Sequence, residues 1–403
     1  MWSQLGRDDR AAWGLYAGSA AEPYRVQADV AVRVTHCTCP SRRYPCKHGD
    51  ALLATLEADP ERFPIQEPPQ WAADWLAGRE AKTSRRAPGI VDEAARAKRV
   101  EQREGRVTQG LDELELWLRD LVQQGLVQAP SKPYTFWENA AARLVDSQAP
   151  GAARMVRELG TIAVGGVGWQ ERMVRALGRL TLLIQAWRRL EHLPEAALAD
   201  VRSAVGFTVS QESVLATEPL RDAWLVAGQR EVMGDRLAQR RTWLLGQVTK
   251  RPAMLLEFAV QEGSLPPALV VGSVMDAEVC FYPGAAPLRA LVKANYGSME
   301  RPHELPCTTT VAECHQSLAA RYAANPWTER QPACLRGVVP VGGGQQWCLR
   351  DDSGALPSFE HSHLLGLSGG HPVDVFAEWD GVKLAPLLVG KGHRFVRLPN
   401  PQY

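Results

Sequence analysis

The stretch Cys37–His48, CTCPSRRYPCKH, places three cysteines and a histidine within twelve residues. Their spacing is C-x-C, then six residues, then C-x-H. In an extended strand, residues i and i+2 point to the same side, so Cys37 and Cys39 can present both thiolates to one metal ion. In a helix, residues i and i+2 do not share a face. We therefore expect Cys46 just before a helix and His48 in its first turn.

The four side chains make a tetrahedral set of three thiolates and one imidazole, which favours Zn²⁺ over Mg²⁺ or Ca²⁺. Because the protein fills all four positions, we predict one structural zinc ion and no catalysis. The predicted ligands are Cys37, Cys39, Cys46 and His48. The competing interpretation is a group of buried cysteines with a histidine nearby by chance. His36 is a competing ligand, but as the neighbour of Cys37 in a strand it should point to the opposite face.

The loop between the two ligand pairs, PSRRYP, carries two cations and an aromatic residue. Such a loop tip can contact phosphates and stack on a base. The alternative is that Tyr44 packs under the loop and that the cations offset the negative charge of the thiolates. The candidate contact residues for a nucleic acid or a protein partner are Arg42, Arg43, Tyr44 and Lys47.

The flanking sequence predicts a strand before this stretch and a helix after it. Residues 24–35, YRVQADVAVRVT, alternate apolar and polar side chains, which is typical of a strand leading into the first cysteine pair. After His48, GDALLATLEA has the spacing of a short amphipathic helix. Trp71 and Trp75 lie four residues apart on one helical face. We expect this pair to pack back on the zinc finger that the metal ligands would form.

The overall charge gives no sign of a polyanionic partner. The chain has 403 residues, which predicts about two to three domains, each long enough to bury a core. Lys and Arg number 46 and Asp and Glu number 45, a formal net charge of +1. A nearly neutral molecule has no field that draws it onto DNA or an anionic membrane. Any contact with nucleic acid must therefore come from a local patch.

The N-terminal sequence, MWSQLGRDDRAAWG, lacks the charged start and apolar stretch of a signal peptide, and no apolar run approaches about 20 residues. We therefore expect a cytoplasmic protein without a membrane segment. In a chain of this length, eight cysteines indicate a metal-ligand set and buried thiols rather than a disulfide framework. Cys280, Cys334 and Cys348 lie in apolar strand patterns and are predicted to be core thiols.

Residues 79–106 are polar and basic, with few large apolar side chains. We interpret them as a solvated linker that passes into the exposed start of a helix. The alternative is a patch for nucleic acid or an acidic partner. Apolar residues at helical spacing then continue to about Gly206 and predict a helical array whose arginines face solvent. Those arginines include Arg175, Arg179, Arg188 and Arg189.

Beyond residue 207 the apolar pattern changes from helical to alternating, apart from one helix predicted within residues 308–325. We predict an α+β fold with a small ββα-like zinc finger, a helical middle region and a β-rich C-terminal half of one or two small antiparallel barrels or sandwiches. The predicted domains are 1–78 (finger with a flanking helix), 79–106 (basic linker or helix), 107–206 (helical), 207–303 (antiparallel β) and 304–403 (helix with a second β domain).

Two further motifs are weaker candidates. HELPCTTTVAECH offers His303, Cys307, Cys314 and His315, but it has no paired-ligand motif, so a second metal site is not favoured. GLSGG matches the G-x-S-x-G pattern of a hydrolase nucleophile, which requires a strand before it and a helix after it. Because a strand-like segment follows, we expect Ser368 in a turn and predict no catalytic residue.

The cysteine and histidine pattern fits the C-x-C…C-x-H arrangement of the SWIM zinc finger. Residues 39–53, CPSRRYPCKHGDALL, closely resemble the form found in a bacterial family of SWIM zinc finger proteins. The resemblance extends over nearly the whole chain. The segments that carry it are WSQLGRDDRAAWG (2–14), PQWAADWL (69–76), ARLVDSQAPG (142–151), RRTWLLGQV (240–248), FYPGAAPLRAL (281–291) and GHPVDVFAEWDG (370–381).

This resemblance implies a bacterial protein, often encoded near a MoxR-type AAA ATPase and a von Willebrand A-like domain protein. Members of the family commonly have a further stretch before the position where this chain starts, so we expect a short N-terminal segment to be missing. SWIM domains in general are taken to bind DNA or proteins. Neither activity follows from the ligand spacing itself.

We therefore expect a non-enzymatic zinc-binding adaptor whose finger shapes a surface for another protein. Its partner would belong to the ATPase and von Willebrand A-like system that the resemblance implies. The alternative is binding of DNA or another nucleic acid through the finger tip and residues 79–106. An enzyme is a third hypothesis, because the β-rich half has no assigned role. The sequence carries no nucleotide, metal-hydrolase or cofactor signature and identifies no small-molecule substrate.

Overall fold

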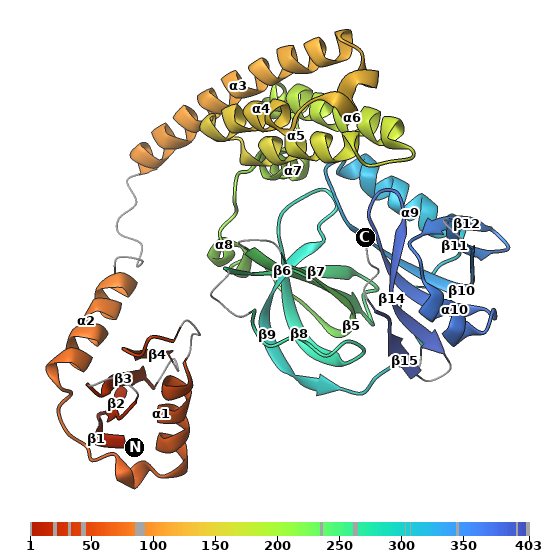
Figure 1. Cartoon of the computed structure of the whole chain (residues 1–403). Coiled ribbons are helices and arrows are strands. Elements are labelled where there is room, and N and C mark those ends of the chain that lie inside the picture. The colour runs from red at the N-terminus through yellow and green to blue at the C-terminus, as the bar shows by residue number, and fades with distance from the viewer. Residues whose placement is uncertain are drawn as a thin grey trace. The chain divides into compact units, whose positions relative to one another are not determined.

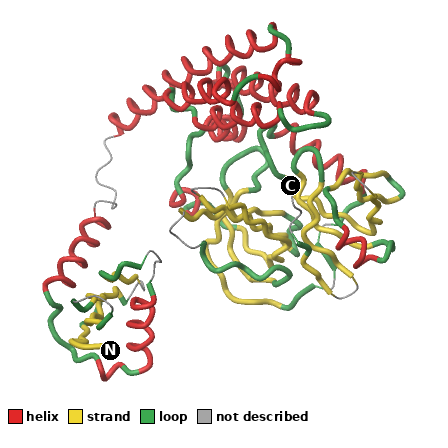
Figure 2. Tube along the Cα trace, in the orientation of Figure 1, coloured by secondary structure: helices red, strands yellow, loops and turns green. Residues whose placement is uncertain are grey.

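The computed structural model describes most of the chain. The described residues are 2–18, 22–30, 34–41, 46–84, 93–233, 237–260, 265–302, 304–306, 308–343, 346–391 and 394–399. The chain divides into two compact units, of which the first contains residues 1–96 with the short segments 233–238 and 258–266. Figure 1 labels the helices and strands, and Figure 2 colours them by type. Both helices and sheets are present, so the predicted α+β class is confirmed.

The first unit is built on a four-stranded antiparallel sheet of order β1-β2-β3-β4. Its strands are β1 (Trp2–Arg7), β2 (Ala11–Tyr16), β3 (Tyr24–Asp29) and β4 (Val34–Cys37), and its helices are α1 (Lys47–Ala58), the short 3-10 helix η1 (Pro60–Arg62) and α2 (Gln70–Ser84). The prediction of one strand over residues 24–35 is wrong, because Val26 pairs with Cys37 and Asp29 with Val34 in a hairpin. In the sequence, the alternation of apolar and polar residues continues between the two strands, so the pattern does not show where one strand ends and the next begins.

Helix α1 packs its apolar face on the sheet. Leu52 and Leu56 lie in one buried cluster with Val26 and Ala28 of β3. The helix comes close to β4 at Gly49, where a Cβ atom would overlap the side chain of Thr35. A residue with no side chain at this position therefore permits the close approach of α1 to β4.

Helix α2 packs on the same unit through a separate small cluster. Ala72 and Leu76 of α2 are buried with Trp13 of β2, and Trp71 and Trp75 are partly buried against them. The prediction that the two tryptophans pack back on the finger is confirmed. Strands β1 and β2 were not among the predicted elements, so the sheet is larger than a ββα-like finger requires.

The second unit begins with a helical bundle (Figure 1). Its elements are α3 (Glu93–Gln123), η2 (Leu126–Ser131), α4 (Tyr134–Asp146), α5 (Pro150–Ala163), α6 (Trp169–Trp187), η3 (Leu190–His192) and α7 (Glu195–Val205). Buried leucines of α3, α4, α5 and α6 share one core, which includes Leu118, Leu144, Leu159 and Leu180. Helix α3 starts well inside the basic segment, so the second half of residues 79–106 is helical.

After the short helix α8 (Gln211–Leu215), five strands close into a barrel of order β5-β6-β7-β9-β8. They are β5 (Leu220–Met233), β6 (Leu237–Gly246), β7 (Pro252–Val260), β8 (Val274–Phe281) and β9 (Arg289–Met299). One pairing, β7 with β9, is parallel. It departs from the expected antiparallel arrangement because β8 lies between these strands in the chain but not in the barrel.

Helix α9 (Val311–Ala324) falls within the predicted helical segment and packs on a second sheet. That sheet has the order β12-β11-β10-β13-β14-β15. Its elements are β10 (Gln331–Gly343), β11 (Gln346–Asp351), β12 (Gly354–Ser358), the short helix α10 (Ser362–Ser368), β13 (Val373–Trp379), β14 (Leu384–Lys391) and β15 (Arg394–Arg397). Among the described strands, β15 lies at one edge of this sheet.

Candidate metal centre

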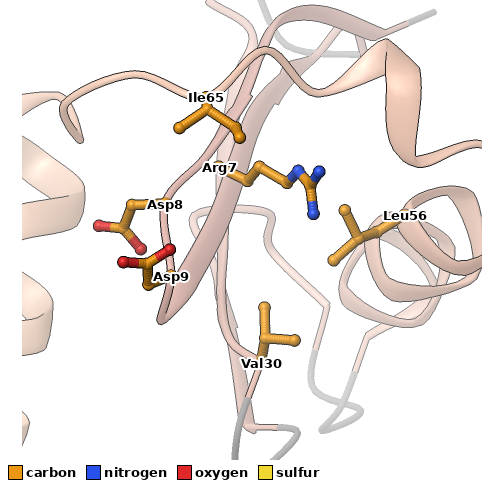
Figure 3. Close-up of a pocket in the computed structure, with 6 residues that line it drawn as sticks. All are labelled: Arg7, Asp8, Asp9, Val30, Leu56 and Ile65. Carbon is orange, nitrogen blue, oxygen red and sulfur yellow. The ribbon is translucent and has the colours of Figure 1, made fainter.

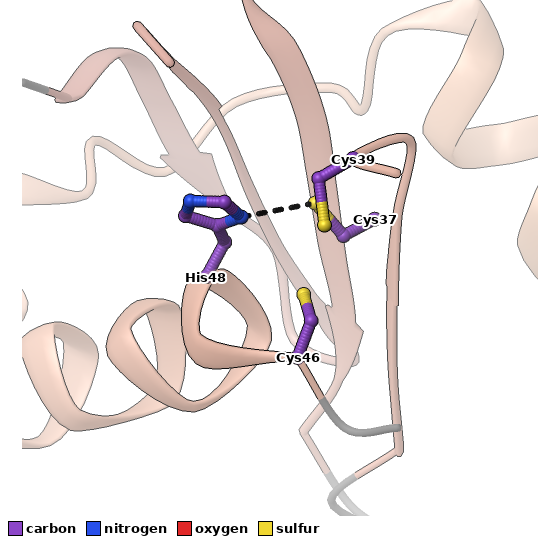
Figure 4. A group of neighbouring side chains, drawn as sticks. All are labelled: Cys37, Cys39, Cys46 and His48. Atoms are coloured by element: carbon purple, nitrogen blue, oxygen red, sulfur yellow. Dashed lines mark hydrogen bonds between the residues drawn. The ribbon is translucent and has the colours of Figure 1, made fainter. Parts of the chain in front are cut away.

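The junction between β4 and α1 brings the predicted ligands together, as Figure 4 shows. Cys37 is the last residue of β4, and Cys39 follows two residues later, just beyond the strand. Cys46 precedes the first residue of α1 in an extended conformation, and His48 is the second residue of the helix. The expected positions of Cys46 and His48 are therefore confirmed, whereas Cys39 lies outside the strand expected to hold it.

The donor atoms of the four side chains fit a small ion. All four lie within 4.8 Å of one another, and Cys37 Sγ is 3.8 Å from His48 Nδ1. A tetrahedral zinc site, with bonds of about 2.3 Å to sulfur and about 2.0 Å to nitrogen, has donor atoms about 3.5 to 3.8 Å apart. A contraction of about 1 Å at the longest separation would give this geometry. The cluster is thus arranged as a four-ligand site that the protein alone completes.

The protonation of the ligands also suits a metal site. Burial lowers the pKa of His48, so its imidazole is neutral at pH 7 and has a lone pair to donate. Burial opposes ionisation of Cys46, but hydrogen bonds from the Gly49 N–H, the neighbouring thiols and the His48 N–H together outweigh it and lower the pKa of the thiol. Burial raises the pKa of Cys37 to about 12, with the neighbouring thiols adding to it. A metal ion would therefore displace a proton from Cys37 on binding.

Two tyrosines that the sequence did not indicate hold the imidazole in place. The ring of Tyr16, from β2, lies 4.6 Å from the His48 ring, and that of Tyr24, from β3, lies 5.3 Å from it. His48 itself is buried. Contacts of this kind fix the orientation of a ligand ring. Tyr16 is the last residue of β2 and Tyr24 is the first residue of β3. Nothing in their sequence spacing connects these tyrosines to His48.

The competing ligand lies elsewhere. His36 is exposed, and its Nδ1 accepts a hydrogen bond of 3.1 Å from Gln27 Nε2. Its ring lies 6.2 Å from that of Trp75. His36 is not among the four clustered donors, as its alternate position in the strand predicts.

Most of the predicted contact residues lie outside the described part of the chain. These are Arg42, Arg43 and Tyr44, which follow Ser41 in the loop between the ligand pairs. Lys47 is described: it is exposed and begins α1, directly after Cys46. The interpretation of the loop tip as a contact surface therefore stays a prediction.

The second cysteine and histidine cluster has no described site. His303 and Cys307 lie outside the described residues. Cys314 of α9 is buried in the core, where burial raises the pKa of its thiol to about 11, whereas His315 is exposed. The structure thus does not bring these two neighbours together at one site.

The environment of Ser368 excludes a nucleophile elbow. Ser368 ends the short helix α10 and precedes β13, so the elements stand in the reverse order of a strand-to-helix turn. The expected turn position is therefore wrong by one residue, since the turn starts at Gly369. The Ser368 hydroxyl is buried, donates to Leu365 O and accepts from the N–H of Gly370.

Two other groups of residues differ from expectation. The seven described cysteines are all free thiols; Cys280 and Cys334 are buried as predicted, but Cys348 is only half-buried. The prediction that the bundle arginines face solvent is wrong for Arg179, whose Nε is buried.

Over the described residues, no helix is long and apolar enough to cross a membrane.

One arginine of the basic segment has a structural role. Arg103 Nη2 donates to Gln148 O at 3.2 Å and to Gly206 O at 3.0 Å, and its guanidinium lies 3.8 Å from the centre of the Phe207 ring. These contacts tie α3 to the ends of α4 and α7. Arg103 is therefore occupied inside the bundle and does not belong to an open cationic surface.

Residues 102–205, which span most of α3 and all of α4 to α7, match the family model of the SWIM-associated four-helix bundle domain. The match covers about a quarter of the chain. Neither the curated proteins nor the solved structures contain a match to the chain. The protein thus combines a SWIM-associated helical domain with an N-terminal cluster of three cysteines and one histidine that has the composition of a zinc-finger site.

Proposed function

We propose that the chain is a zinc-binding adaptor of the SWIM type, in which a structural ion shapes a surface for another protein. The observation that carries this proposal is the donor set of Cys37, Cys39, Cys46 and His48, whose four donor atoms lie within 4.8 Å of one another. Four such donors complete the coordination of a tetrahedral ion and leave no position for substrate. Three sulfurs and one imidazole nitrogen are the donors that zinc prefers in structural sites. The chain is accordingly proposed to be non-enzymatic.

A small pocket on the first unit supports a protein-binding role (Figure 3). It has a volume of about 250 Å³ and includes Leu56 of α1 and Ile65, whose side chain is 76% exposed. The Arg7 side chain points toward Leu56, while Asp8 and Asp9 point the other way. Arg7 Nε is buried, and no described residue accepts a hydrogen bond from it. A partner segment with an aliphatic side chain beside a carbonyl or carboxylate would satisfy both the apolar surface and this donor.

The proposed partner is a component of a MoxR-type AAA ATPase and von Willebrand A-like system in a bacterium. Its support is the resemblance of the ligand stretch and of six further segments to SWIM finger proteins of that setting. The SWIM-associated match over residues 102–205 agrees with that resemblance. A cytoplasmic location follows from the same proposal.

Nucleic-acid binding is the alternative function. It would use the loop between the ligand pairs together with exposed cations of residues 79–106, such as Lys98 and Arg106 in the first half of α3. The near-zero net charge and the internal contacts of Arg103 argue against a strong positive electrostatic field over residues 79–106.

The two functions are separated by capture of partners with the tagged full chain from its own cells, with and without nuclease. We expect an AAA ATPase or von Willebrand A-like protein to be recovered in both conditions, with about one zinc ion per chain by elemental analysis. Ile65→Arg should abolish recovery of this protein partner. Val127→Arg places the same charge on an equally exposed apolar residue outside the first unit and should leave recovery unchanged.

Loss of recovery after nuclease would favour the nucleic-acid alternative, as would tight binding of a labelled duplex or single strand that weakens steeply with salt. If the Ile65→Arg variant still recovered the protein partner, the pocket would not be the binding surface. A chain without stoichiometric metal would contradict the zinc centre.

A further inference from the structure

A large cavity lies within the second unit, between the helical bundle and the C-terminal sheet. Its volume is about 640 Å³, within the range of about 300 to 1,000 Å³ that is typical of sites for small ligands. Helices α5 and α6 contribute one side, α9 contributes another, and the turn between β13 and β14 contributes a third. None of its lining residues belongs to the metal centre.

One wall of the cavity is cationic. Arg172, Arg175 and Arg179 are spaced three and four residues apart on α6, which puts them on one face of the helix, and all three line the cavity. Arg330, at the entrance to β10, also lines it. Guanidinium groups present paired donors that match the oxygen atoms of a phosphate.

Neutral acceptors hold two of these arginines in place. Arg175 Nη1 donates to Gly381 O at 2.8 Å, and Arg172 donates to Gly165 O at 2.7 Å and to Val167 O at 3.0 Å. Backbone carbonyls orient a guanidinium without cancelling its charge. Arg172 and Arg175 are therefore positioned by the protein but keep their positive charges.

Arg179 has a buried donor without an acceptor in the described part of the chain. Its Nε is buried, yet no described residue accepts a hydrogen bond from it. A buried donor without an acceptor is unfavourable, and more so when the group is charged. An anion in the cavity would supply the missing acceptor.

Two of the three acidic residues in the lining, Glu329 and Asp380, already have partners. Glu329 pairs with Arg154, which is not part of this lining. Asp380 lies 3.6 Å from Arg330 and also accepts hydrogen bonds from the N–H groups of Val382 and Lys383. Glu158 is exposed. The arginines of α6 thus face a single carboxylate, that of Glu158, that is not committed to another group.

Another part of the lining is apolar and aromatic. Leu318, Ala319 and Tyr322 of α9 line the cavity at helical spacing, and Trp379, at the end of β13, lies beside them in the lining. Aromatic side chains offer flat faces on which a nucleobase can stack. The cavity therefore combines a charged wall for phosphate with an aromatic wall for a planar ring.

Contacts between the surrounding elements keep the cavity formed. Trp327 Nε1 donates to Arg179 O at 3.1 Å, and Asn325 Nδ2 donates to Asp200 of α7 at 2.7 Å. The ion pair between Arg154 and Glu329 is a third link between the bundle and the segment after α9. A site that is formed before the ligand arrives loses less free energy to ordering on binding.

We propose that this cavity binds a nucleoside diphosphate or a close analogue, with its phosphates against Arg172, Arg175 and Arg179 and its base against Tyr322 and Trp379. More than one guanidinium faces the cavity, so a ligand with two or more negative charges is favoured over a monoanion. The site is independent of the zinc centre and goes beyond the adaptor function.

The test is calorimetric titration of the full chain with ADP, adenosine and inorganic pyrophosphate. We expect ADP to bind, and each fragment to bind at least about tenfold more weakly, because each lacks one of the two recognised groups. Arg179→Gln should weaken ADP binding by about tenfold or more. Arg119→Gln, which removes an exposed arginine of α3 that pairs with Glu115, should leave it unchanged.

A second variant tests the site without altering any charge. Ala319 is exposed and lines the cavity, so Ala319→Trp should fill the space and abolish ADP binding while all the arginines remain. Far-ultraviolet circular dichroism checks that each variant is folded. The proposal is overturned if ADP gives no binding up to about 1 mM, or if it binds equally to the wild type and to folded Arg179→Gln and Ala319→Trp. Equal affinity for pyrophosphate and ADP would overturn recognition of the base.

Discussion

Arg241 of β6 donates two hydrogen bonds to Glu378 of β13, Nε to Oε2 at 2.7 Å and Nη2 to Oε1 at 2.9 Å. The same carboxylate accepts from Trp243 Nε1 at 2.9 Å and is completely buried. Arg230 and Arg330 lie 3.8 and 3.9 Å from it. One buried glutamate thus links the barrel to the C-terminal sheet through a paired arginine and a tryptophan.

Replacing Glu378 by glutamine should destabilise the second unit strongly. Glu378→Gln keeps the shape but leaves the largely buried Arg241 without its counter-charge, and breaking such a pair costs about 3 to 5 kcal/mol. The free energy of unfolding in urea measures the loss. Glu191→Gln, at an exposed position of η3, should change it by less than about 0.5 kcal/mol. A similar small change in both variants would mean that the pair contributes little.

The same pair predicts a loss of stability in acid. Burial would raise the pKa of Glu378, but the hydrogen bond and charge of Arg241 outweigh it and hold the pKa below its usual value. A carboxyl with a depressed folded-state pKa stabilises the protein above its unfolded pKa, about 4.3, and loses that contribution as the pH falls through the folded value. As the pH is lowered from about 6 to about 3, the melting temperature should fall more steeply for wild type than for Glu378→Gln. Parallel curves would contradict this assignment.

Removing one ligand should release the metal. Cys46→Ser leaves three donors, and structural zinc sites of this kind contribute on the order of 10 kcal/mol to local folding. We expect the zinc content to fall from about one ion per chain to near zero, and hydrogen exchange in β3, β4 and α1 to accelerate. Cys348→Ser alters a half-buried thiol outside the centre and should retain the metal. Stoichiometric zinc in Cys46→Ser would refute the ligand assignment.

The ring of Tyr16 should matter for metal affinity although it donates no ligand. Tyr16→Ala removes the surface against which His48 packs and should weaken zinc binding by about tenfold, the lower end of effects from the residues that support metal ligands. Tyr16→Phe keeps the ring and should bind nearly as tightly as wild type. Competition with a chromophoric chelator measures both affinities, and equal loss in the two variants would point to the hydroxyl instead of the ring.

Gly49→Ala should disturb the same junction from the helix side. The added Cβ would overlap Thr35 Oγ1 and lie 2.9 Å from Thr35 Cβ, so α1 must move away from β4, at a cost of about 1 to 3 kcal/mol. Thr35→Ala in the same chain should restore part of the loss. Gly78→Ala in α2 has open space around it and should be neutral or slightly stabilising. Thermal melts of the three variants decide the comparison.

The parts of the site that were predictable are those encoded by short spacing. Cys37, Cys46 and His48 lie within one strand-to-helix junction, so the periods of a strand and a helix suffice to place them. Tyr16 and Tyr24 come from strands joined to that junction only by sheet pairing. Because pairing partners are set by tertiary packing, the spacing along the chain could not identify them.

Changes in the spacing of apolar residues along the sequence predicted the fold class. They did not predict the contacts between the helices and strands. Arg179 has the position of a polar residue on an amphipathic helix, and such a pattern cannot distinguish solvent from a cavity lined by another element. The division into β3 and β4 was missed for a related reason, since the apolar and polar alternation continues in the sequence between these two strands. The parallel pairing of β7 with β9 depends on chain topology, which local periodicity does not contain.

The edge strand β15 carries an exposed arginine at each end, Arg394 and Arg397, around the half-buried Phe395 and Val396. Edge strands offer backbone groups that can pair with a second copy, and charged side chains on the edge discourage such aggregation. Repulsion between exposed charges is screened as ionic strength rises, with a Debye length of about 10 Å at 0.1 M and about 3 Å at 1 M. We therefore expect the colloidal stability of the concentrated protein to be set by salt, with self-association through this edge favoured in high-salt buffers.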